Sequence, residues 1–180
     1  MSNIFPSKIP LEIKNDSKRE GEIIVFEILK KLTDDYQIYY SVDWTRKKKG
    51  FTDQEGECDF IIIHKLLGIV CVEVKGGKVF KEIENGKGVF YSKDKNGSTH
   101  KIKNPYKQAK KTKYLLLDYW KNNIKNPPWI NIKHAVIFPE TNKPDKLLTL
   151  NEHESITLYK EDLLKIKSKI VALFTIDYNE

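Results

Sequence analysis

Two runs of mostly apolar, β-branched residues dominate the middle of the sequence. They cover residues 59–64 and 69–75 and are separated by a short turn that ends at Gly68. Strands that are apolar on both faces are typical of the centre of a sheet that is covered on both sides. The sequence therefore predicts an antiparallel hairpin in the middle of an α/β domain, flanked by helices.

Spacing and capping residues predict the elements around this hairpin. Ser17 and Glu20 have the spacing of a capping box, so a helix should begin at Ser17 and continue to about Leu32. Asn104 and Pro105 supply an N-cap and a first-turn proline for a second helix, which should end near residue 123. The remaining predictions are strands at 37–42, 134–138 and 155–159 and a final amphipathic helix at 161–174.

The chain is expected to form one domain with additions. The predicted parts are an N-terminal arm (1–16) and a single domain (17–180) that contains an inserted β-meander (78–103) and a C-terminal strand-helix extension (140–180). Pro6 and Pro10 predict no regular element in the arm. Asn85-Gly86 and Asn96-Gly97 are strong hairpin-turn signals and predict the meander.

Charge and composition limit the classes of function. The 180 residues include Lys+Arg 32 and Asp+Glu 25, a net charge of +7, which suits a polyanionic partner, although a lysine-rich codon bias would produce the same excess. No apolar run approaches the roughly 18 residues of a membrane span, and residues 1–15 lack the pattern of a signal peptide, so a cytoplasmic protein without a membrane partner is expected. Cys58 and Cys71 lack zinc-site spacing, which favours buried, reduced thiols.

Charged residues interrupt the apolar hairpin at one end. Glu73 and Lys75 share one face of their strand because side chains alternate, and antiparallel pairing brings Asp59 roughly level with Glu73. Two carboxylates beside one ammonium group form an oxygen-rich site that suits Mg²⁺. The simpler alternatives are an ion pair at the sheet edge for Glu73 and Lys75, and a strand-start residue bonded to backbone for Asp59.

Two further polar residues lie on the predicted helices. Glu22 falls on or beside the apolar stripe of the first helix, from which it could reach the same cavity, although the helix dipole alone would also favour an acid there. Gln108 lies in the first turn of the second helix, where its side chain and the helix N-terminus could hold an anion such as phosphate. An ordinary polar helix residue is the alternative for Gln108.

The chain resembles the nuclease-related domain (NERD) family of the PD-(D/E)XK nuclease superfamily. The resemblance rests on Glu22, Asp59, Glu73-Val74-Lys75 and Gln108, in this order. The similar motifs are Gly21-Glu22, Gly56-Glu57-Cys58-Asp59, Val72-Glu73-Val74-Lys75-Gly76, and Asn104-Pro105 ahead of Gln108. The similarity runs from about residue 17 to residue 138. It implies a restriction-endonuclease-like αβββαβ core, with a mixed central sheet flanked by helices. The meander is longer than a minimal domain of this family needs.

The resemblance implies a metal-dependent nuclease that cleaves phosphodiester bonds with Mg²⁺ or Mn²⁺ as cofactor. Asp59, Glu73 and the Val74 carbonyl would hold the ion, and Glu22 would hold a second ion or a water on the first. Lys75 would orient the attacking water or offset charge on the phosphorus. Gln108 would steady Lys75 or the scissile phosphate.

Basic side chains are expected to bind the flanking phosphates as point charges without reading bases, so sequence specificity should be weak, and DNA is expected in preference to RNA. These residues are Arg46, Lys47, Lys48 and Lys49 in a loop and Lys107, Lys110 and Lys111 on the second helix. A solvated charged face is the alternative for each run.

The resemblance also bears on partners. Members of the family often occur fused to helicase or kinase domains, which implies a helicase or ATPase partner, in trans or as a fused domain, and a role in DNA processing or defence. Two alternatives stay open: a catalytically weak nucleic-acid-binding module of a larger assembly, and an unrelated α/β interaction domain. The oligomeric state, monomer or homodimer, is also open.

Overall fold

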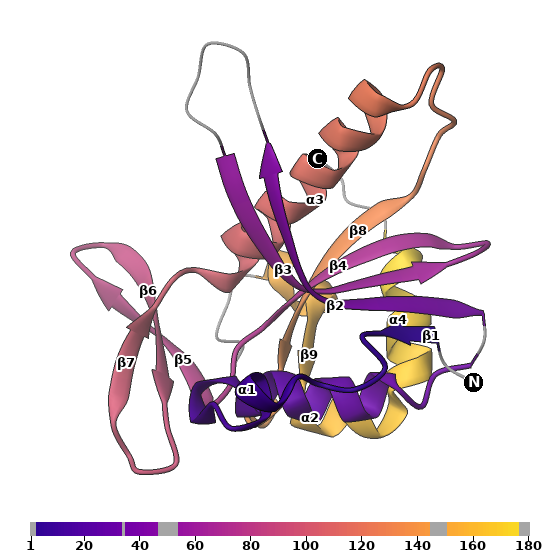
Figure 1. The fold of residues 1–180 in the computed structure, drawn as a ribbon. Helices are drawn as coiled ribbons and strands as arrows, with labels where there is room; N and C mark the ends of the chain where they lie inside the picture. The colour runs from indigo at the N-terminus through magenta and orange to yellow at the C-terminus, as the bar shows by residue number, and fades with distance from the viewer. Residues whose placement is uncertain (1–2, 34, 47–53, 145–150, 177–180) are drawn as a thin grey trace.

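The computed structural model describes residues 3–33, 35–46, 54–144 and 151–176, which form a mixed α/β domain (Figure 1). The strands are β1 (Asn3–Phe5), β2 (Tyr36–Arg46), β3 (Gln54–His64), β4 (Gly68–Val74), β5 (Lys78–Glu84), β6 (Lys87–Lys93), β7 (Thr99–Ile102), β8 (Ile132–Phe138) and β9 (Thr157–Tyr159). The α-helices are α1 (Leu11–Lys14), α2 (Glu20–Leu29), α3 (Pro105–Asn123) and α4 (Ile166–Phe174), and 3-10 turns cover Ser17–Arg19, Asn151–Ile156 and Lys160–Lys165.

Within these residues the main sheet has six strands in the order β1-β2-β3-β4-β8-β9. β2, β3 and β4 pair antiparallel, whereas β1 on β2, β4 on β8 and β8 on β9 are parallel pairs. The predicted hairpin is β3-β4, in which Phe60 pairs with Val72 and Ile63 with Ile69. From residue 17 on, the element order is also as predicted: a helix, three strands, an inserted meander, a helix, a strand, and a final strand and helix.

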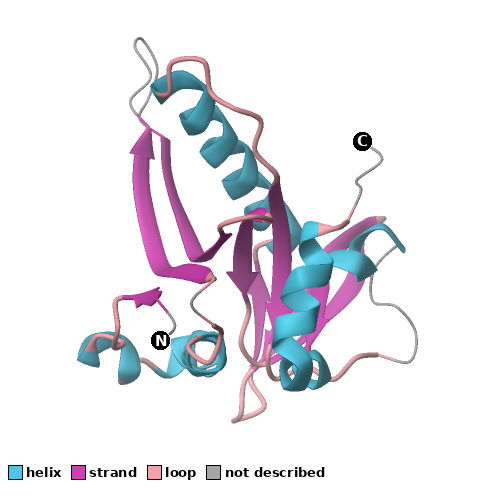
Figure 2. Ribbon diagram, turned by 90° about the vertical axis from the view of Figure 1, so that its right-hand side faces the viewer, coloured by secondary structure: helices cyan, strands magenta, loops and turns pink. Residues whose placement is uncertain are grey.

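Helices cover both faces of the main sheet (Figure 2). On one face, Val70 and Val72 of β4 are fully buried in a cluster with Phe26 of α2 and Ile170 of α4. On the other face, Cys71 lies in a cluster that includes residues of α3. The apolar runs are therefore buried on both sides, as their pattern predicted, and Cys58 and Cys71 are both buried and free.

The N-terminal region differs from the prediction in two ways. Ser17 does not cap a helix: Asp16 caps a 3-10 turn at Ser17–Arg19 by accepting the Lys18 N–H at 2.9 Å, and α2 follows it without a side-chain cap. α2 then ends at Leu29, earlier than the apolar spacing suggested. Residues 1–16 also contain regular structure, since β1 adds to the sheet edge beside β2 and α1 follows it.

The small sheet β5-β6-β7 is the predicted meander (Figure 1). Asn85 and Gly86 form its first turn with φ of +48° and +74°, the left-handed pair that a two-residue hairpin turn requires. The second turn is not the expected Asn-Gly hairpin. Asp94 organises a five-residue loop there, because its Oδ1 accepts the N–H groups of Asn96 and Ser98, both at 2.9 Å.

Two other boundaries differ from the predictions. β2 is longer than the predicted strand because its second half continues to pair with β3 as far as Arg46 opposite Gln54. The strand expected at 155–159 is reduced to β9, and the last helix is a 3-10 turn followed by α4. None of the helices in the described ranges is long and apolar enough to cross a membrane.

Candidate active site

Glu73 and Lys75 form a buried ion pair at the C-terminal end of β4. The Lys75 Nζ lies 2.7 Å from the Glu73 Oε1, and the two side chains are 25% and 5% exposed. Burial alone would lower the pKa of Lys75, but the Glu73, Asp59 and Glu22 carboxylates together raise it above its ordinary value. Lys75 is therefore a charged ammonium group held by a buried carboxylate.

Asp59 lies beside this pair, at the level of Glu73, as the hairpin register predicted. Its Oδ2 accepts the backbone N–H of Val74 at 2.6 Å, so the strand that carries Glu73 also holds Asp59 in place. Burial raises the pKa of Asp59 well above its usual range, and the Glu73 and Glu22 charges raise it further. Burial also raises the pKa of Glu73, although Lys75 opposes this effect. The site thus concentrates negative charge with little water to screen it.

The ladder between β2 and β3 is interrupted opposite Asp59. Tyr40 pairs with Phe60 and Val42 with Cys58, while Ser41 between them has a φ of +50°. A left-handed serine within a strand is strained and bends the chain at this point. The interruption explains how β2 and β3 change direction beside the carboxylates and extend beyond the sheet (Figure 1).

Glu22 reaches the edge of the same site from the first turn of α2. Its Oε2 accepts a hydrogen bond from the Tyr40 hydroxyl at 2.7 Å and lies 3.5 Å from the Arg19 Nη1. Burial raises the pKa of Glu22, while Tyr40 and Arg19 oppose the shift. Arg19 also bonds Glu57 at 3.2 Å, so one arginine bridges two acids.

Tyr40 and Arg19 are the site residues that sequence reasoning missed. Tyr40 falls within the strand predicted at 37–42, and nothing local in the sequence shows that its hydroxyl reaches α2. Arg19 lies three residues before Glu22, a spacing that permits an ion pair on a helix. This spacing is the sequence feature from which the contact between Arg19 and Glu22 could have been predicted.

Gln108 is placed at the start of α3, as predicted. Asn104 caps this helix by accepting the Lys107 N–H at 3.1 Å, and Pro105 opens it. The Gln108 Oε1 is buried and accepts no hydrogen bond from the described residues. The structure does not join Gln108 to Lys75 by a hydrogen bond, so the predicted steadying role remains a prediction. A buried amide oxygen without a donor is nonetheless rare in folded proteins.

The donor set suits a hard divalent ion. Asp59 Oδ1 and Glu73 Oε2 make no hydrogen bond or ion pair with the described part of the chain, so each carboxylate keeps one oxygen for a ligand. Among the described residues there is no group of three or more Asp, Glu, His or Cys side chains arranged around a metal position. Glu22 therefore does not complete a three-carboxylate cluster with them. Mg²⁺ is often held by one or two carboxylates, with water and substrate oxygens as the other ligands.

The predicted phosphate-binding residues are only partly described. Lys107, Lys110 and Lys111 lie exposed on α3, and the Lys110 Nζ lies 5.8 Å from the centre of the Tyr114 ring. Lys47, Lys48 and Lys49 lie outside the described residues, and Arg46 is described only as the last residue of β2.

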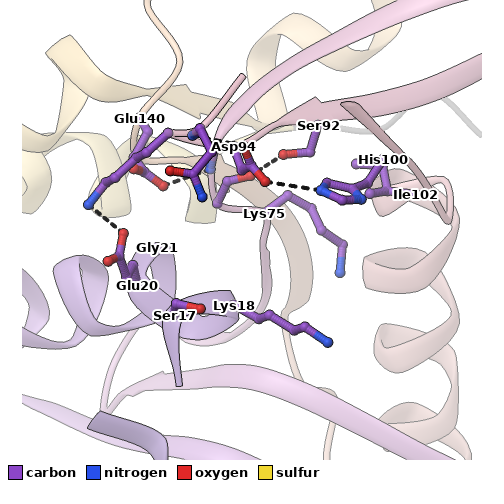
Figure 3. A pocket seen from close by; sticks show the side chains of 14 residues that line it. Ser17, Lys18, Glu20, Gly21, Lys75, Ser92, Asp94, His100, Ile102 and Glu140 are labelled. Carbon is purple, nitrogen blue, oxygen red and sulfur yellow. Dashed lines mark hydrogen bonds and ion pairs between the residues drawn. The ribbon is translucent and has the colours of Figure 1, made fainter. Parts of the chain in front are cut away.

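A cavity of about 630 Å³ opens directly beside Lys75 (Figure 3). It lies between the start of α2 and the meander, and Lys75, Ser92, His100 and Glu140 are among its lining residues. An ion pair between Lys95 and Glu20 spans its edge. The cavity offers space for a ligand next to the Lys75 ammonium group, and Asp59 and Glu73 are not among the residues that line it.

Gly21 sets the distance between α2 and the chain that carries Lys75. A Cβ atom on Gly21 would lie 2.7 Å from the Gly76 Cα, too close for any rotamer to relieve. We expect Gly21→Ala to lower the free energy of unfolding by roughly 1–3 kcal/mol, as overpacking does, despite the better helix propensity of alanine. Thermal unfolding by circular dichroism measures this, with Glu27→Ala, an exposed change on the same helix, as the control. Equal melting temperatures for Gly21→Ala and the wild type would contradict it.

The fold and the site define a class: a mixed α/β domain with buried carboxylates and a lysine at the end of a central strand. Residues 17–139, more than half of the chain, match the family model of the nuclease-related domain (NERD). The chain belongs to this family. No curated protein and no solved structure matches it.

Proposed function

We propose that this protein is a Mg²⁺- or Mn²⁺-dependent nuclease that hydrolyses phosphodiester bonds of nucleic acid, with DNA as the substrate and weak sequence specificity. The observation that carries the proposal is the burial of Asp59 and Glu73 together beside Lys75, in a domain of the nuclease-related family. We also propose that the core has the restriction-endonuclease-like topology, which the order of α2, β2, β3, β4, α3 and β8 supports.

Asp59, Glu73 and the Val74 carbonyl would hold the ion. A divalent ion at this position supplies charge that polarises the phosphate and activates water. The raised pKa of each carboxyl supports the assignment, because a bound cation would offset the cost of burying a charged carboxylate and the repulsion from neighbouring acids.

The chain's own residues would position the reacting groups. The Lys75 ammonium, fixed by Glu73 at 2.7 Å, would hold the attacking water by a hydrogen bond or offset the charge that develops on the phosphate oxygens. Glu22, held by the Tyr40 hydroxyl, would accept a hydrogen bond from water at the edge of the site. The unpartnered Gln108 oxygen would accept a hydrogen bond from Lys75 or from water when substrate is bound.

Substrate would be bound mainly through its backbone. The exposed lysines of α3, Lys107, Lys110 and Lys111, and the basic run from Arg46 to Lys49 would contact phosphates. Lysine provides a point charge and no bidentate fork for a base, which supports weak sequence specificity.

The test is incubation of the full chain with supercoiled plasmid, linear duplex, single-stranded DNA and RNA, each with Mn²⁺, Mg²⁺ or EDTA. We expect cleavage of DNA with either ion and none in EDTA. Cleavage that persists in EDTA would contradict the proposal, as would the absence of cleavage of every substrate with both ions.

A second function fits the same site: among the described residues, no three acidic, histidine or cysteine side chains surround a metal position, although one or two carboxylates often hold Mg²⁺. A catalytically weak nucleic-acid-binding module of a larger assembly would need no such group. It predicts salt-sensitive binding without turnover in the same experiment. A helicase or ATPase partner, and a role in DNA processing or defence, would be consistent with either function.

A further inference from the structure

The outer face of the meander carries a partly exposed aromatic pair and a pair of opposed lysines. The inner face carries Val79 and Phe90, which are buried against the Tyr106 ring of α3. The outer face points away from this core because side chains alternate along a strand. It carries Phe80 and Tyr91, a directly opposed cross-strand pair whose rings lie 5.6 Å apart at 21°, and both side chains remain partly exposed.

Two lysines of the same face stand directly opposite each other. Lys78 pairs with Lys93 in the β5-β6 register, both are exposed, and neither has an ion-pair partner among the described residues. Like charges in directly opposed positions destabilise a sheet. An anion bound between them would remove this repulsion.

Charge on the outer face is uneven along the strands. Near the tip, the Glu84 carboxylate neutralises Lys101 at 3.0 Å and accepts the Tyr91 hydroxyl. At the base, no carboxylate forms an ion pair with Lys78 or Lys93 among the described residues, because the Asp94 carboxylate that follows Lys93 bonds its own loop and His100. Toward the tip, the acids Glu82 and Glu84 balance Lys87 and Lys101 on this face, whereas Lys78 and Lys93 leave an excess of positive charge at the end that adjoins the active site.

The base of the meander is attached rigidly to the active-site end of the main sheet. Only Gly76 and Gly77 separate Lys75 from β5. The Gly77 N–H donates to Glu140 at 2.6 Å, the Val79 N–H donates to Thr141 at 2.8 Å, and the Ser92 hydroxyl donates to the Gly76 carbonyl at 2.6 Å. A ligand bound on the outer face would thus be held at a constant distance from Lys75.

We infer that this face binds unpaired nucleotides of the nucleic-acid substrate, with the Lys78–Lys93 pair on a phosphate and the Phe80–Tyr91 pair against a base. The inference rests on the proposed function and adds the substrate class, a single-stranded segment next to the cleavage site. Aromatic rings beside unpaired lysines are the elements with which proteins bind single strands, since every base has a flat face to stack. A paired base within a duplex cannot present that face.

Binding is measured by fluorescence anisotropy with labelled single-stranded DNA, single-stranded RNA and duplex DNA, in EDTA so that nothing is cleaved. Phe80→Leu/Tyr91→Leu keeps apolar side chains but removes the rings, and should weaken single-strand binding about tenfold or more. Lys78→Gln/Lys93→Gln should reduce the slope of log affinity against log salt by roughly 1.4, while the melting temperature stays equal or rises. Lys165→Gln/Lys167→Gln, on exposed positions around the start of α4, is the control of equal charge.

Three results would overturn the inference. The two double variants of the outer face could bind single strands like the wild type, the Lys165/Lys167 control could lose as much affinity as they do, or they could lose as much affinity for duplex DNA as for single strands. The two single-stranded probes show whether DNA or RNA is preferred. Plasmid cleavage with Mn²⁺, measured separately, tests the proposed function. Single-strand binding through this face without any cleavage would uphold the inference and contradict the nuclease proposal. Cleavage by the wild type, together with unchanged single-strand binding by the outer-face variants, would uphold the nuclease proposal and contradict the inference.

Discussion

Lys75→Ala should reduce cleavage about 10²- to 10³-fold while the protein stays folded. Loss of one preorganised charge at the reacting phosphate has an effect of this size in other enzymes. The Mn²⁺ affinity should stay the same or increase, because the substitution removes a positive charge 2.7 Å from Glu73. Single-turnover cleavage with saturating Mn²⁺ and calorimetric titration of Mn²⁺ measure the two quantities.

The control is Lys169→Ala, which removes an equally charged side chain that pairs with Asp162 away from the site. It should cleave like the wild type. A Lys75→Ala protein that binds Mn²⁺ much more weakly would show that Lys75 supports the ion site instead of the reaction. Wild-type cleavage by this variant would remove Lys75 from the mechanism.

Asp59→Asn should abolish metal-dependent cleavage and, in EDTA at neutral pH, should make the protein more stable than the wild type. The amide oxygen can still accept the Val74 N–H that Asp59 now accepts at 2.6 Å. The substitution removes a buried charge that repels Glu73 and Glu22. An increase of a few degrees in melting temperature is expected, since about 1 kcal/mol corresponds to roughly 2–4 °C for a domain of this size.

The stability difference between Asp59→Asn and the wild type should depend on pH. Burial raises the pKa of Asp59 in the folded protein above its value of about 3.9 in the unfolded chain, so the folded state binds the proton more tightly. The resulting stability is fully present below the unfolded pKa and is lost as the pH rises through the folded pKa. The stability advantage of Asp59→Asn should therefore appear above that pH and disappear in acid. Mn²⁺ should narrow the difference in melting temperature by stabilising the wild type alone. An Asp59→Asn protein less stable than the wild type in EDTA at neutral pH would contradict a destabilising buried charge on Asp59.

The pairing of the central strands was predictable because it depends on local pattern. Alternation placed Glu73 and Lys75 on one face, and a short turn brought Asp59 level with Glu73, which the Asp59–Val74 hydrogen bond confirms. Asn104 and Pro105 predicted the start of α3 for a similar reason, since a cap bonds within its own turn. These interactions join residues whose relative positions the backbone geometry alone determines.

Choices between neighbouring residues were less predictable. Asp16 and Ser17 are both good helix caps, and only the course of the chain into α2 decides that Asp16 accepts the Lys18 N–H. Asn96-Gly97 has the sequence of a tight turn, yet the Asp94 carboxylate competes for the same backbone N–H groups and forms a longer loop. In each case two local solutions differ by little free energy.

The sequence by itself determined the strand pairing, the order of the elements and the convergence of Asp59, Glu73 and Lys75, because strand period and turn length act over a few residues. Only the tertiary structure decided that Tyr40 holds Glu22, that no donor in the described part of the chain reaches the Gln108 oxygen, and that the meander is fixed beside Lys75. Those arrangements depend on the packing of α2, α3 and the small sheet against the main sheet. Packing is set by contacts between residues distant in the chain, which no local pattern records.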